Sequence, residues 1–294
     1  MRYSIAAAAL LAVAIIVPSA AARAPKAPTQ PILSCETYSL RDLYAQGKLT
    51  LEQTPALLKE LHIPGITFND MFFGDRYKDK AYLDTLKRAV KDAGCVVTGF
   101  IIEGNLAGGD ENARKRQIQE DMEKMRAAAY LGAPVCRINL GGVSRGEDEA
   151  VGTERVIAAF KEMLPLAKQL NLKITIENHG GVSGQADNII KIIKATDPKW
   201  VGSCLDFGNW PDSVRYQECQ KLAPYAYHVH AKAYRFDENG ESVGVDFGRI
   251  LSMLRAVKYN RAISIEFEGA GDPIEGVKKS RDLVVKDWPG IRTS

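Results

Sequence analysis

Residues 174–181 read Ile-Thr-Ile-Glu-Asn-His-Gly-Gly, a short β-branched run that ends in a carboxylate, an amide and an imidazole. β-Branched residues favour strands, and the two glycines free the backbone to turn directly afterwards. Because side chains alternate along a strand, Glu177 and Thr175 share one face and Asn178 turns towards the other. The stretch therefore indicates a strand that presents a carboxylate at its carboxyl end.

Three other runs have the same build, since each is an apolar segment that carries residue types able to bind a metal. They are residues 201–206 with Asp206, residues 227–232 with His228, His230 and Lys232, and residues 262–268 with Glu266 and Glu268. Four apolar strands that each end in such residues predict one site, collected at one rim of the fold.

The whole chain alternates between short apolar runs and amphipathic segments with helical periodicity. The expected strands are residues 33–39, 65–68, 96–102, 135–140, the run that opens at Ile174, and residues 201–205, 227–233 and 262–267. The expected helices are residues 50–61, 80–93, 111–131, 154–170, 187–195, 213–222, 247–257 and 273–285. Eight strand–helix pairs over about 260 residues predict an α/β fold, a single-domain (β/α)8 TIM barrel, with a doubly wound open sheet as the alternative.

Helix boundary signals support this division. Thr50 with Gln53 three residues later predicts a helix start, and Pro273 lies where the first turn of the closing helix is expected. Gly94 and Gly132 each follow a predicted helix and suit its carboxyl end.

The first 24 residues predict a secretory signal peptide. Arg2 precedes an apolar run over residues 5–17, and small residues that suit a cleavage site follow. We expect export to a bacterial periplasm, with the mature chain beginning between Ala21 and Lys26, and a retained N-terminal anchor is the alternative. The apolar run is shorter than the roughly 18 residues that span a bilayer, and no later run reaches that length, so we expect no membrane contact after cleavage.

The composition is that of a globular protein with nearly balanced charge. The expected division is a signal peptide at residues 1–24, a Pro-rich leader at residues 25–32, the barrel at residues 33–288 and a tail at residues 289–294. The formal net charge is +3, but without Arg2 and Arg23 the chain has 37 basic and 36 acidic residues. That balance gives no electrostatic reason to expect nucleic acid as a partner. The sequence leaves a homo-oligomer open.

The five cysteines are an odd number and form no CxxC pair. Cys35, Cys136 and Cys204 lie in apolar runs, where a buried free thiol behaves as a small hydrophobic side chain. Cys95 and Cys219 are the freer candidates for a disulfide, although sequence alone gives no connectivity.

A barrel places its active site at the carboxyl ends of its strands, where the polar runs fall. Glu177, Asp206, His230 and Glu266 offer three carboxylates and one imidazole. Such a donor set suits Mn²⁺, Mg²⁺ or Co²⁺ and permits Zn²⁺. Each residue alone has a plainer explanation, a solvated strand end or a core histidine, but all four together favour a divalent metal site.

These motifs resemble the xylose isomerase-like TIM barrels, the sugar phosphate isomerase/epimerase superfamily. The resemblance covers most of the expected mature chain, and it rests on residues 176–181, 205–209, 228–232 and 264–269, with Tyr38-Ser39-Leu40-Arg41 on the first strand. It implies that the metal ligands are Glu177, Asp206, His230 and Glu266. His230 is chosen over His228 because the family's ligand histidine precedes an x-Lys pair.

One position departs from the family pattern. Family members often carry a carboxylate at the end of the second strand, whereas this chain has Asn69 there. No role for that position is therefore carried over.

The resemblance implies a divalent-metal-dependent isomerase or epimerase that acts on a sugar or keto-sugar through an enediolate. A metal on two adjacent substrate oxygens acidifies the C–H between them. Glu177 and Glu266 would then be both ligands and acid/base groups on opposite faces, and Lys232 would polarise a carbonyl. The alternative is a lyase or hydratase on a 3-keto-glycoside or related keto-sugar. A non-catalytic sugar-binding protein and an endonuclease-like barrel have less support.

Several further residues are candidates for binding a small carbohydrate substrate. They are His179, Arg137, Trp210, His228 and Glu103. Arg137 and Glu103 suit sugar oxygens or a buried ion pair equally, and Trp210 suits stacking on a sugar ring or packing. Glu268 shares the face of Glu266 and is a weaker candidate for orienting Lys232. No Gly-rich phosphate loop is present, so the expected substrate has no phosphate anchor.

Overall fold

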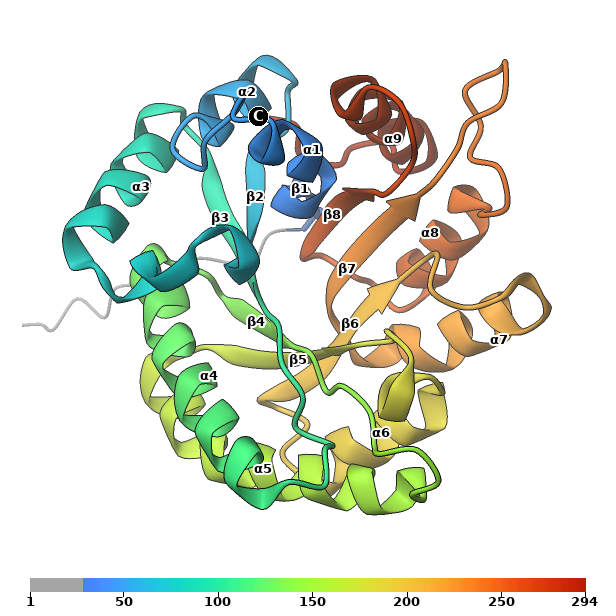
Figure 1. The fold of residues 1–294 in the computed structure, drawn as a ribbon. Coiled ribbons are helices and arrows are strands. Elements are labelled where there is room, and N and C mark those ends of the chain that lie inside the picture. The colour runs from blue at the N-terminus through green and yellow to red at the C-terminus, as the bar shows by residue number, and fades with distance from the viewer. Residues whose placement is uncertain (1–28) are drawn as a thin grey trace, which may run out of the picture.

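The computed structural model describes residues 29–294, so the predicted signal peptide and the first half of the Pro-rich leader lie outside the described residues. Eight parallel strands close into a barrel in chain order, and helices surround it (Figure 1). The strands are β1 Ile32–Glu36, β2 Gly65–Asn69, β3 Val96–Ile102, β4 Val135–Ile138, β5 Lys173–Glu177, β6 Val201–Asp206, β7 Ala226–Ala233 and β8 Ala262–Phe267. The predicted TIM barrel is confirmed, and β1 closes it by pairing Leu33 with Ile263 of β8.

The surrounding helices follow the predicted order. They are α1 Arg41–Ala45, α2 Thr54–Glu60, α3 Lys80–Asp92, α4 Glu111–Leu131, α5 Glu149–Leu170, α6 Ala186–Ala195, α7 Asp212–Leu222, α8 Phe247–Ala256 and α9 Pro273–Asp287. Short 3-10 turns lie at Thr37–Leu40, Asp70–Phe72, Gly74–Lys78, Gly181–Ser183 and Ala223–Tyr225. Aspartates cap many of the helices, as when Asp110 accepts a hydrogen bond from the Ala113 backbone N–H at 2.9 Å. Such a cap stabilises a helix by about 1 kcal/mol.

Three element boundaries differ from expectation by three residues or more, each for a local reason. β1 ends at Glu36 rather than Ser39, because the chain turns into a 3-10 helix at Thr37. α2 begins at Thr54, since the Gln53 side chain accepts a hydrogen bond from the Thr50 backbone N–H at 2.9 Å and closes a turn before the helix. α5 begins at Glu149, five residues early, where Asp148 caps it.

All five cysteines are buried and free. Cys35, Cys136 and Cys204 lie in the core as predicted, and Cys95 and Cys219 do not pair with each other. Burial raises the pKa of Cys35, Cys204 and Cys219 to about 12, so these thiols stay protonated at neutral pH.

A layer of hydroxyl groups fills the barrel interior at mid-height. Thr67 is its centre, with its Oγ1 3.0 Å from Thr98 Oγ1, 3.1 Å from Ser264 Oγ and 3.2 Å from His228 Nε2. Ser34 Oγ closes the layer 2.6 Å from Thr98 Oγ1. These side chains are buried, so each depends on the others for hydrogen bonds.

This hydroxyl layer lies directly beneath the rim of the barrel. Residues two apart on a strand share a face, so Ser34 lies below Glu36, Thr67 below Asn69, His228 below His230 and Ser264 below Glu266. The layer therefore supports the side chains at the strand ends.

We expect Thr67→Val to lower the free energy of unfolding by about 1–3 kcal/mol, because it leaves His228 Nε2 without its buried partner and Ser264 with only the 3.5 Å contact to Ser34 Oγ. Thr67→Ser retains the hydroxyl and should cost less. Urea unfolding of the two variants checks this, and equal stability of Thr67→Val and the wild type would contradict it.

Candidate metal centre

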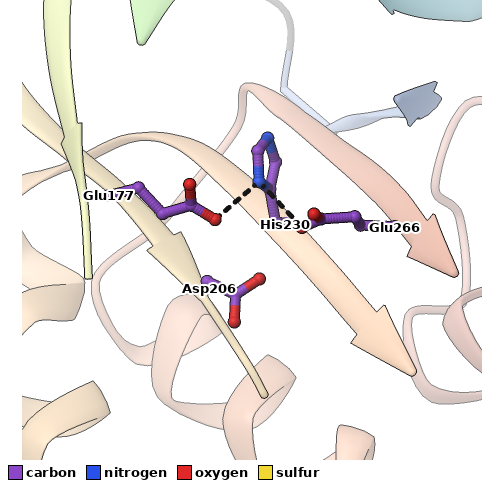
Figure 2. Close-up of side chains that lie close together, drawn as sticks. All are labelled: Glu177, Asp206, His230 and Glu266. Atoms are coloured by element: carbon purple, nitrogen blue, oxygen red, sulfur yellow. Dashed lines mark hydrogen bonds and ion pairs between the residues drawn. The ribbon is translucent and has the colours of Figure 1, made fainter. Parts of the chain in front are cut away.

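Glu177, Asp206, His230 and Glu266 meet at the carboxyl ends of four neighbouring strands, β5 to β8. Each offers one ligand atom, and these atoms all lie within 4.8 Å of one another (Figure 2). Figure 2 shows the carboxylates of Glu177 and Glu266 on opposite sides of the His230 ring, with Asp206 below. All four side chains are buried. The structure thus gathers the ligand set predicted from sequence.

His230 connects the two glutamates. Its Nδ1 lies 3.0 Å from Glu177 Oε1 and 3.1 Å from Glu266 Oε2. Asp206 is held by its own loop, since its Oδ1 accepts hydrogen bonds from the backbone N–H groups of Gly208 at 2.8 Å and Asn209 at 2.7 Å. The other oxygen, Asp206 Oδ2, is buried and accepts no hydrogen bond.

Each glutamate also has its own cation. Arg137 forms an ion pair with Glu177 Oε2, and Lys232 Nζ lies 3.1 Å from Glu266 Oε1. Burial alone would raise the pKa of both carboxyls, but Arg137 and His230 hold the pKa of Glu177 well below its usual range. Against the same burial, Lys232 and His230 lower the pKa of Glu266 to about 2. Both glutamates are therefore ionised at neutral pH.

Asp206 behaves differently from the glutamates. Burial raises its pKa well above the usual range, and Lys232, 3.7 Å from Asp206 Oδ2, offsets only part of that effect. Burial of three carboxylates so close together is unfavourable without a compensating cation. A buried oxygen without a partner, beside two ionised glutamates and an imidazole, fits a divalent ion of the kind predicted, Mn²⁺, Mg²⁺ or Co²⁺, with Zn²⁺ permitted.

Lys232 is buried and held from three sides. Its Nζ donates hydrogen bonds to Asn209 Oδ1 at 3.0 Å and Glu268 Oε1 at 3.2 Å, besides its contact with Glu266. Burial would lower its pKa, but the carboxylates of Asp206 and Glu266 raise it well above the usual range. Lys232 is therefore a fixed cation beside the ligand cluster, and Glu268 orients it.

The structure pairs Arg137 with Glu103, the second arrangement expected for them. Arg137 Nη1 donates to Glu103 Oε1 at 2.6 Å, and Asn139 Nδ2 donates to Glu103 Oε2 at 2.6 Å. Because Arg137 also contacts Glu177, the pair reaches from β3 to the ligand cluster.

The remaining candidates lie at different depths. His179 is exposed and lines the cavity over the ligands. Trp210 is buried and donates from Nε1 to the Gly184 carbonyl oxygen at 2.8 Å, away from the residues that line that cavity. His228 lies in the hydroxyl layer, where burial and the nearby His230 hold its pKa well below the usual range. Trp210 and His228 thus have hydrogen-bond partners within the protein, and neither lines the cavity over the ligands.

Sequence reasoning missed Glu36. Its Oε1 accepts a hydrogen bond from Asn69 Nδ2 at 3.0 Å, and its Oε2 lies 3.6 Å from His230 Nδ1. Burial and the nearby Glu266 raise its pKa to about 8. In the sequence, Glu36 stands out as an acidic residue within an apolar run. The predicted first strand extends to Ser39, which places Glu36 inside the strand, whereas β1 ends at Glu36 and so brings it to the rim.

A cavity of about 260 Å³ opens over this cluster. Its lining comes from several strand ends, including Glu36, Tyr38, Asn69, Glu103, Arg137, Glu177, His179, Glu266 and Glu268. The arrangement can hold a small polar molecule against a divalent ion.

A family model described as xylose isomerase-like TIM barrel matches residues 55–287. A C-glycoside deglycosidase alpha subunit from Arthrobacter globiformis is 36% identical over 75 residues, which cover 23% of this chain and 21% of that protein. The match thus spans about a fifth of the relative's length.

No helix within residues 29–294 has the length and apolar character needed to cross a membrane.

Two solved structures of sugar epimerases share the fold. An L-ribulose 3-epimerase superposes with a TM-score of 0.70 at 16% identity, covering 88% of this chain and 95% of that one. A 3-keto-D-glucoside 4-epimerase from E. coli has a TM-score of 0.68 at 14% identity, covering 87% of this chain and 100% of that one. Identities this low show a common fold alone.

We expect the metal-free protein to lose stability as pH rises from about 4.5 to about 8, because Glu36 keeps its proton in the folded state up to about pH 8 but loses it near 4.5 when unfolded. Mn²⁺ should offset that loss, and should raise Tm more at pH 8 than at pH 6 because it displaces protons. Thermal melts in EDTA and in Mn²⁺ check this. Glu36→Gln should flatten the metal-free pH profile, and an Mn²⁺ effect independent of pH would contradict the prediction.

Proposed function

The chain belongs to the xylose isomerase-like TIM barrel family, and on that premise we propose that it is a divalent-metal-dependent isomerase or epimerase acting on a sugar or keto-sugar. The observation that carries this proposal is the buried cluster of Glu177, Asp206, His230 and Glu266 with the cation Lys232 against it. A merely structural ion cluster would not need a cavity of about 260 Å³ over it.

A divalent ion held by these four residues would polarise a substrate carbonyl and acidify the adjacent C–H group. Glu177 and Glu266 are both ionised, so either can accept that proton, and they approach from opposite sides of His230 (Figure 2). A proton taken up on one side and returned on the other inverts the carbon, and its return to the neighbouring carbon gives an isomer.

Lys232 complements the negative charge that develops when the proton leaves. Its ammonium group is already fixed by Glu266, Glu268 and Asn209, so little reorganisation is needed during the reaction. Arg137 has the matching place beside Glu177, where it keeps that carboxylate ionised.

A second candidate is a lyase on a 3-keto-glycoside. The matched region of a protein named C-glycoside deglycosidase alpha subunit favours this reading. The same base would remove the proton beside the keto group, and the resulting electron pair would expel the substituent at the β-carbon, which leaves with a proton. Product analysis separates this lyase reaction from an isomerisation.

We expect Glu177→Gln and Glu266→Gln each to reduce turnover by orders of magnitude and to weaken metal binding, because an amide replaces an anionic ligand. Lys232→Met should leave metal affinity nearly unchanged but reduce kcat by roughly 10²–10³. Metal titration and steady-state kinetics on the three variants check this. Full activity in Lys232→Met would remove this residue from the mechanism.

Solvent deuterium should enter the substrate carbon beside the carbonyl during turnover, because the abstracted proton exchanges with water on the carboxylate. Mass spectrometry of the product from reactions in D₂O measures this uptake. Turnover of neutral ketoses without any uptake would count against proton abstraction and favour a hydride shift.

A further inference from the structure

Glu36 presents one carboxylate oxygen that the described protein leaves without a hydrogen bond. Glu36 is 2% exposed at the end of β1, and Asn69 Nδ2 occupies its Oε1 at 3.0 Å. Asn69 is itself fixed, since its Oδ1 accepts from the Met71 backbone N–H at 3.1 Å. Glu36 Oε2 is buried and accepts no hydrogen bond. The side chain therefore has a set orientation and one free acceptor.

No lysine or arginine is available to that oxygen, and the basic group that approaches it is His230. Arg137 is committed to Glu103 and Glu177, and Lys232 to Glu266, Glu268 and Asn209. His230 Nδ1 comes to 3.6 Å, beyond hydrogen-bonding distance, and already faces the two glutamate ligands.

Glu36 also differs from the four candidate metal ligands. The group whose ligand atoms lie within 4.8 Å of one another contains Glu177, Asp206, His230 and Glu266, and Glu36 is outside it. Yet Glu36 lines the same cavity, on the β1–β2 side that contributes no ligand. A buried carboxyl oxygen without a hydrogen-bond partner is costly, so a hydrogen-bonding group from outside the protein fits this position.

The cations of the site indicate what kind of ligand fits this position. Arg137 is paired with Glu103 and Glu177, and Lys232 with Glu266 and Glu268. Neither is therefore free to bind a phosphate ester or a uronate, whereas the hydroxyl group of an uncharged sugar can form a hydrogen bond with Glu36 Oε2.

We propose that Glu36 binds a hydroxyl group of an uncharged sugar through Oε2, and that Asn69 is the positioning residue that holds Glu36 in place. This rests on the proposed function only in taking a sugar as the ligand. It assigns sugar selection to the β1–β2 side of the cavity and metal binding to β5 through β8. A site built around such an acceptor rejects the analogue that lacks the hydroxyl.

Glu36→Gln is the sharpest test, because its amide oxygen can still accept from Asn69 while the free acceptor becomes an N–H donor. The probes are D-fructose, D-xylulose and methyl 3-keto-D-glucoside, titrated calorimetrically into Mn²⁺-loaded protein. We expect Glu36→Gln to weaken binding of at least one probe roughly 10–100-fold, since the position of Oε2 can then no longer accept a hydrogen bond from the sugar. Mn²⁺ affinity, measured separately, should change less than about threefold, as expected for a residue outside the ligand set.

Asn69→Ala is the second variant, because it keeps the carboxylate but loses its support. It should weaken sugar binding by a smaller factor and leave Mn²⁺ affinity unchanged. Monodeoxy analogues of the best probe add a double-mutant cycle. One analogue should bind the wild type much more weakly than its parent, and that difference should vanish in Glu36→Gln.

The outcomes separate the two proposals. If none of the three neutral sugars binds the Mn²⁺-loaded wild type, the proposed function and this inference both fail. If they bind wild type and Glu36→Gln equally, only the inference fails. A loss of Mn²⁺ affinity above tenfold in Glu36→Gln would make Glu36 a metal ligand and overturn it. Tighter binding of D-fructose 6-phosphate than of D-fructose would overturn the uncharged-ligand assignment.

Discussion

Carboxylates buried close together repel one another, and the site of this protein depends on how that repulsion is balanced. Three of them lie with an imidazole within 4.8 Å, and Glu36 adds a fourth from β1. In water these groups would separate, but here each side chain projects from a strand whose position the closed barrel determines. Coulomb interactions are strong in such an interior. Arg137 and Lys232 supply part of the compensating charge, and a divalent ion held by the cluster would supply more.

The compensation is arranged in pairs. Glu177 has Arg137 and Glu266 has Lys232, so each acid/base candidate has a cation that keeps it ionised without occupying all of its oxygens. These cations are held by further acids, Glu103 on one side and Glu268 on the other. Beneath them the hydroxyl layer gives the barrel interior a polar but uncharged floor. The candidate ligands therefore keep their orientation, and the cations beside them balance part of their charge.

Different strands of the barrel provide different parts of the site. The strands from β5 to β8 provide the candidate ligands, β3 and β4 provide the Glu103–Arg137 pair, and β1 and β2 provide Glu36 with Asn69. The barrel fold explains why the first group meets, because it sets where the strand ends lie. It does not determine which side chains the β1–β2 side carries, since the same fold is compatible with many different sites.

The fold and the ligand set could be predicted from sequence because both depend on local patterns. Strand and helix periodicity determine the eight units, and parallel strands in a barrel place their carboxyl ends together, so Glu177, Asp206 and Glu266 follow from their positions along the chain. The choice of His230 over His228 came from the family resemblance. The depth of a side chain in the barrel and the residues that it contacts could not be predicted in this way, because they depend on residues far apart in sequence. His228 and His230 share a face, and only the barrel shows that one lies in the hydroxyl layer and the other at the rim. From the sequence, Arg137 suited either a sugar or an ion pair, and only the structure shows that Glu103 lies beside it. Glu36 reaches the site because the chain turns at Thr37, and its partner Asn69 lies on the neighbouring strand, so only the tertiary structure brings that pair together.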